Sequence, residues 1–162
     1  MIKIFVLALC IGLVVVVLPA NADQWDKATT VTFRAPVELP NIVLQPGTYV
    51  FRLLDTPGNR HVVQVFNAEE TQLYTTILAI PNYRMKPADK TLMPFEERAA
   101  GKPEAMHAWF YPGDNFGQEF VYPKAKAIEL AKETQAPVLA AEVTPNETPK
   151  QLLEAPILTV NP

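Results

Sequence analysis

The chain has 162 residues, a formal net charge of −3 at pH 7 and 49% hydrophobic residues. This length predicts one domain that can bury a substantial core. The slightly acidic balance leaves no basic stripe, which argues against nucleic acid and against an anionic membrane surface as partners. Serine is absent from the sequence, so Ser-His-Asp and Ser-Lys mechanisms are excluded.

The first 22 residues match a secretory signal peptide. Lys3 provides a positive start, residues 4–18 carry no charge, and Ala20 and Ala22 form an A-x-A cleavage site. The apolar run is shorter than the roughly 20 residues that a membrane-spanning helix needs. We therefore expect cleavage after Ala22 and export to the periplasm or the extracellular space, with no membrane span in the mature chain. Cleavage also removes Cys10, the only cysteine, so we expect neither a disulfide nor a catalytic thiol.

Residues 23 to about 122 have the pattern of an all-β domain. Turn signals separate short β-branched or aromatic runs at 29–34, 41–44, 48–54, 60–66, 71–80, 91–97, 106–111 and 117–122. In the first run, Val31 and Phe33 alternate with polar residues, which is typical of a strand with one buried face. The runs at 49–54 and 73–80 are apolar on both faces. We therefore predict a two-layer β-sandwich of about seven to nine mostly antiparallel strands, with one sheet partly covered by a helix.

The end of the chain divides into a helix and a proline-rich tail. Pro123 suits the first turn of a helix, and Ala125, Ile128 and Ala131 share one face of a helix predicted over 124–133. The domain is thus predicted to span 23–133, with a flexible tail over 134–162 that includes a loose linker at 144–150. Residues 157–160 are apolar again, and we expect either a frayed terminus or an edge strand, in this chain or on a partner's sheet. No repeat or heptad pattern indicates an oligomeric state.

The richest candidate site is an aromatic turn. Residues 109–122 hold six aromatic residues around the centre Pro112-Gly113-Asp114-Asn115-Phe116-Gly117. Aromatic planes beside amides and carboxylates can bind a sugar, whereas the same rings can simply fill a sandwich core. Arg84, in a loop bracketed by two prolines, can grip a carboxylate or phosphate or make a surface ion pair. For a carbohydrate or an envelope polymer, the predicted ligand-binding residues are Trp109, Tyr111, Asp114, Asn115, Tyr122 and Arg84.

Two other function classes stay open. A small hydrolase or metal-dependent enzyme would bring four side chains into one pocket, namely Glu96, His107, Asp114 and Glu119. The two histidines are isolated and have no metal-binding spacing, and no phosphate loop or dinucleotide fingerprint is present. We therefore assign no catalytic residue, metal or cofactor. The third class is an envelope interaction module that donates the strand at 157–160 to another protein.

Five segments carry a family resemblance. Residues 46–51, 61–67, 78–84, 95–98 and 108–124 resemble a set of uncharacterised exported bacterial proteins, with the block at 109–123 as the most specific part. The similarity covers most of 29–131. It implies a shared fold and export. It implies no activity, because the family has none assigned.

Overall fold

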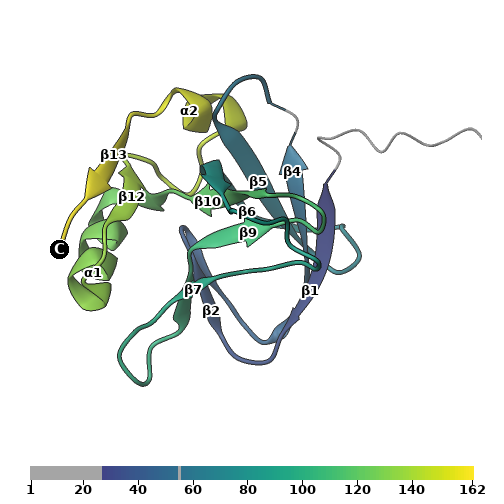
Figure 1. Cartoon of the computed structure of the whole chain (residues 1–162), viewed down its shortest axis with the longest axis horizontal. Coiled ribbons are helices and arrows are strands. Elements are labelled where there is room, and N and C mark those ends of the chain that lie inside the picture. The colour runs from purple at the N-terminus through teal and green to yellow at the C-terminus, as the bar shows by residue number, and fades with distance from the viewer. Residues whose placement is uncertain (1–26, 55) are drawn as a thin grey trace, which may run out of the picture.

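The computed structural model describes residues 27–54 and 56–162 (Figure 1). The predicted signal peptide, residues 1–22, lies outside the described residues. Thirteen strands in three sheets and two helices make up the described part, which confirms the all-β class. None of the helices in these two ranges has the length and apolar character to cross a membrane.

The largest sheet, sheet A, has six strands and is antiparallel throughout. Of the strands predicted between 29 and 80, those at 29–34, 48–54, 60–66 and 71–80 form here, because runs of β-branched and aromatic residues are flanked by turns such as Pro46-Gly47. The strand predicted at 41–44 forms in a second sheet. An irregularity between Val65 and Phe66 shifts the register between the strand that begins at His61 and the next strand along the chain. In spatial order the strands are β1 (Ala28–Phe33), β4 (Gly47–Leu54), β5 (His61–Asn67), β6 (Leu73–Tyr83), β10 (Phe116–Phe120) and β9 (Ala108–Phe110).

Two small sheets complete the architecture and account for the excess over the predicted seven to nine strands. Sheet B contains β3 (Ile42–Leu44), β2 (Val37–Leu39), β8 (Glu104–Met106) and β7 (Phe95–Glu96), with β2 and β8 parallel. Sheet C contains β11 (Tyr122–Pro123), β12 (Val138–Ala141) and β13 (Ile157–Val160), with β11 and β12 parallel. Their strands are two to four residues long, too short to show a clear period in the sequence.

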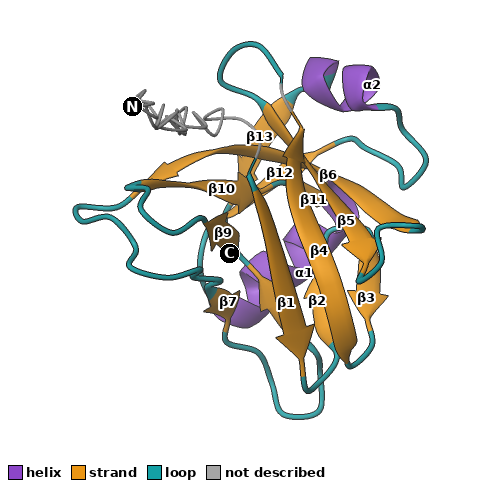
Figure 2. Ribbon diagram, turned by 90° about the vertical axis from the view of Figure 1, so that its right-hand side faces the viewer, coloured by secondary structure: helices purple, strands orange, loops and turns teal. Residues whose placement is uncertain are grey.

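The main core lies between one face of sheet A, sheet B and the helix α1 (Lys124–Thr134). Figure 2 shows α1 behind β1 and β4. The predicted helix is confirmed, but its predicted apolar face is right only at Ala131, since Ala125 is exposed and Ile128 is 37% exposed. Ala127 and Leu130 are buried beside Ala131, because the i, i+3, i+4 stripe centred on the bulky Leu130 faces the sheets.

A second core covers the opposite face of sheet A. Leu78 and Val121 pack there against Ala141 of β12 and Leu152 of the second helix, α2 (Pro149–Glu154). This arrangement explains why β6 is apolar on both faces. The cover comes from the segment that we predicted as a flexible tail, which carries β12, α2 and β13. The edge strand expected at 157–160 forms within this chain, antiparallel to β12.

Candidate functional site

Two rings of the predicted sugar platform lie inside the protein. Trp109 is 1% exposed and packs at 6.2 Å, between ring centroids, against Phe51 of the main core. Tyr122 is 2% exposed, and its hydroxyl donates to the carbonyl of Met106 at 2.7 Å. Burial raises the pKa of this hydroxyl above its ordinary value. The predicted stacking role is therefore wrong for both residues, because neither ring presents a face to a sugar.

The turn itself binds a lysine of its own chain. Asp114 forms an ion pair with Lys27, and both side chains are largely shielded from solvent. The Lys27 ammonium lies 4.5 Å from the ring centroid of Phe116 and 5.6 Å from that of Tyr111. The backbone carbonyl of Lys27 accepts a hydrogen bond from the amide of Leu53 at 2.8 Å, which fixes the lysine at the start of β1. Sequence reasoning missed Lys27, since no local pattern joins positions so far apart.

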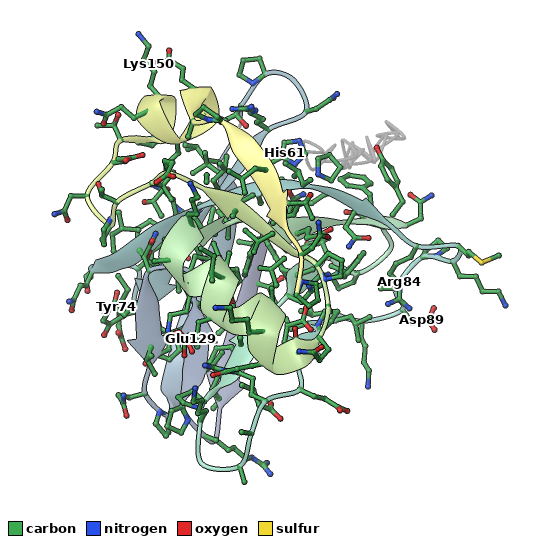
Figure 3. The ribbon with its side chains drawn as sticks, turned by 90° about the vertical axis from the view of Figure 1, so that its left-hand side faces the viewer. His61, Tyr74, Arg84, Asp89, Glu129 and Lys150 are labelled. Atoms are coloured by element: carbon green, nitrogen blue, oxygen red, sulfur yellow. The ribbon has the colours of Figure 1, made fainter. Side chains whose placement is uncertain are left out.

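Arg84 and Asn115 meet through their backbones. The amide of Arg84 donates to the carbonyl of Asn115 at 2.6 Å, which ties the loop after β6 to the aromatic turn. Both side chains are exposed, and the Arg84 guanidinium lies 5.3 Å from the ring centroid of Phe110. Figure 3 shows Arg84 beside the loop that projects from the body of the domain. The structure thus places Arg84 next to the turn and Asn115 exposed within it, while Trp109 and Tyr122 lie in the core.

Three of the four residues of the enzyme hypothesis come together. The Nδ1 atom of His107 is 2.7 Å from a carboxylate oxygen of Glu96, and its Nε2 atom is 3.7 Å from one of Glu119. Asn82 donates to the second oxygen of Glu119 at 2.8 Å. Asp114 is engaged with Lys27 instead. Within 27–54 and 56–162, no group of three His, Cys, Asp or Glu residues is arranged to hold a metal ion.

A hollow lies elsewhere, between the β1–β2 connection and the loop that precedes β8. Its volume is about 610 Å³, and its lining is mostly apolar. Sequence reasoning missed this hollow because its walls come from two segments that are distant along the chain. The residues that matter for its chemistry are the apolar Phe33, Val37 and Phe95 and the charged Arg34, Lys102 and Glu104.

The charged groups of the hollow differ in their partners. Lys102 bonds Glu129 at 3.3 Å and also Glu133, both on α1, and these hydrogen bonds raise the pKa of Lys102. Arg34 is exposed and makes no hydrogen bond or ion pair with any residue that the structure describes. Glu104 is also exposed. The hollow therefore offers an apolar interior with charges of both signs among its lining residues.

A buried arginine holds the wall of this hollow in place. The Arg98 side chain is only 2% exposed and bonds Glu38 of β2 as well as Glu133 of α1, the latter at 2.8 Å. Its guanidinium also donates to the carbonyl of Pro103 at 3.0 Å. Because Pro103 lines the hollow, these bonds fix the loop over 98–103 against both β2 and α1.

Comparisons with models of protein families, with curated proteins and with solved structures give no match to this chain. The resemblance to exported bacterial proteins therefore stays a prediction, and any proposal on function rests on the geometry of the molecule itself.

Proposed function

We propose that the chain is an exported binding module that holds a small amphipathic ligand in the hollow beside β1 and β8. The observation that carries this proposal is the size and lining of the hollow. A volume of about 610 Å³ falls within the roughly 300–1,000 Å³ range that is usual for small-molecule sites. The mostly apolar lining also fits such a site, because apolar contact supplies affinity while a few polar groups fix orientation.

The lining suggests how a ligand is oriented. Its apolar part packs against Phe33, Val37 and Phe95, and its polar end meets the charged Arg34 and Glu104. An envelope component with an apolar group has this chemistry. The signal-peptide pattern over residues 1–22 supports export to a compartment where such a component occurs.

A filling substitution tests the proposal. Ala35 lines the hollow and is exposed, so Ala35→Trp places an indole in the ligand's space without disturbing a buried side chain. Ala68→Trp, in the exposed turn after β5, is the matched control because it adds the same ring away from the hollow. The probe is N-phenyl-1-naphthylamine, an apolar dye that becomes fluorescent on binding.

We expect the unsubstituted protein and Ala68→Trp to bind the dye with equal affinity. Ala35→Trp should weaken binding at least about tenfold, because the ligand then has to displace a packed ring. Equal binding by all three proteins, or no binding by the unsubstituted protein, would contradict a ligand site in this hollow.

A further inference from the structure

The surroundings of Lys27 have the composition of a cation-binding site. A carboxylate from Asp114 pairs with the ammonium group, and two aromatic rings, Phe116 and Tyr111, lie within 4.5 and 5.6 Å of it. Ring faces attract cations through their quadrupole, and a carboxylate accepts charge-assisted hydrogen bonds. We call Tyr111, Asp114 and Phe116 the ammonium site.

The backbone of the ammonium site is held by contacts that do not involve the Lys27 side chain. The carbonyl of Asp114 accepts from the amide of Ala88 at 3.0 Å, and the amide of Gly113 donates to the carbonyl of Ala88 at 2.7 Å. Gly113 has a φ of +85°, a conformation that glycine adopts without strain. We therefore expect the loop over 113–114 to keep its conformation when the Lys27 side chain is shortened.

The site also adjoins a small internal space. A cavity of about 10 Å³, enough for one water molecule, is lined by Lys27, Asp114, Phe116, Trp109 and other residues. The indole N–H of Trp109 is buried and finds no acceptor among the residues that the structure describes. Shortening Lys27 thus enlarges a cavity that already has polar groups on its wall.

We propose that Tyr111, Asp114 and Phe116 form a binding site for a primary ammonium group on an unbranched alkyl chain, and that Lys27 fills this site in the free protein. The carboxylate favours a primary over a quaternary ammonium, because only the primary group has N–H donors for Asp114. A free alkylamine and the lysine side chain of another protein both carry this chemistry. The proposal is independent of the hollow, since the two sites share no lining residue.

Chemical rescue tests the proposal. Lys27→Ala removes the atoms Cγ, Cδ, Cε and Nζ, which n-propylammonium supplies as a free molecule of the same length. We expect Lys27→Ala to lower the thermal unfolding midpoint and n-propylammonium to restore it. The neutral n-propanol should not restore it, nor should tetramethylammonium, which lacks a donor. Lys27→Met, whose side chain fills the space without a charge, should show no rescue by n-propylammonium.

A second substitution locates the rescue. Asp114→Asn in the Lys27→Ala background keeps the shape of the site and removes its charge, so rescue should disappear. Nα-acetyl-lysine methylamide replaces n-propylammonium in a parallel titration. Rescue by n-propylammonium alone indicates that the site takes a free amine, whereas rescue by the lysine derivative indicates that it also takes a lysine side chain. Equal rescue by n-propanol, or no rescue of a folded Lys27→Ala protein, overturns the proposal.

Competition in the unsubstituted protein gives an independent measurement. The indole N–H signal of Trp109 in a nitrogen–proton correlation spectrum reports on the cavity, and n-propylammonium should shift it with about tenfold weaker affinity than in Lys27→Ala, because the tethered lysine competes. Equal affinity in both proteins means that the amine binds elsewhere and overturns the proposal. If Lys27→Ala does not fold, the titration of the unsubstituted protein with n-propylammonium decides. The proposal is then overturned if the Trp109 signal does not shift at any amine concentration that leaves the circular-dichroism spectrum unchanged.

Discussion

Replacing Arg98 with methionine should destabilise the protein far more than replacing its neighbour Lys102. Both cations contact the same two glutamates of α1, but Arg98 is 2% exposed and Lys102 is 43% exposed at the side chain. Arg98→Met would leave the buried carboxylate of Glu38 with Lys126 as its remaining partner, at 2.8 Å. Breaking a buried pair on one side costs about 3–5 kcal/mol, and because Lys126 remains as a partner the expected loss is about 3 kcal/mol.

Urea unfolding measures this loss as a change in the free energy of unfolding. Lys102→Met should leave that free energy nearly unchanged, because an ion pair in solvent is screened and flexible. Adding Glu38→Gln to Arg98→Met should recover part of the stability, since the uncompensated charge is then gone. The reasoning is refuted if Arg98→Met and Lys102→Met unfold at the same urea concentration, or if Glu38→Gln brings no recovery.

Two further predictions concern packing and pH. Gly117→Ala should lower the free energy of unfolding by about 1–3 kcal/mol, because its Cβ would lie 2.5 Å from the buried ring of Phe110. Thermal unfolding measures this loss, and a loss below about 0.5 kcal/mol would contradict the predicted clash. Hydrogen bonds from Lys126 and Lys102 lower the pKa values of Glu129 and Glu133 in the folded protein. The pKa of glutamate in the unfolded chain is about 4.3. The stability from these two glutamates is therefore fully present above that pH and is lost as pH falls through their lower folded pKa values. Acid unfolding of a Glu129→Gln/Glu133→Gln variant should therefore be flatter than that of the unsubstituted protein, and identical profiles would contradict the link.

The long antiparallel strands and α1 could be read from the sequence, because their signals are local. Turn residues such as Pro46-Gly47 separate runs of β-branched and aromatic residues, and Pro123 marks the helix start. A signal for α2 was also present, since Thr148, Pro149 and Gln151 form a capping box with proline in the first turn. The proline content of the surrounding segment obscured it.

The candidate sites could be predicted only in part. The aromatic turn was found by composition, but the pattern did not tell which rings face inward; Trp109 pairs with the buried Gln118 across β9 and β10, and this register directs it to the core. The pairing of Lys27 with Asp114 and the hollow beside Phe95 depend on contacts between distant segments. No periodicity in a single sequence encodes such contacts.

The parallel pairing of β2 with β8 has a consequence for how the protein matures. Val37 and Glu104 are partners in this pairing and both line the hollow, although they lie far apart along the chain. Bringing such segments together carries a large loop-closure cost that is recovered only when the remaining contacts form. The hollow is thus a property of the finished fold alone, and a ligand that enters it would favour the completed state over every partly folded one.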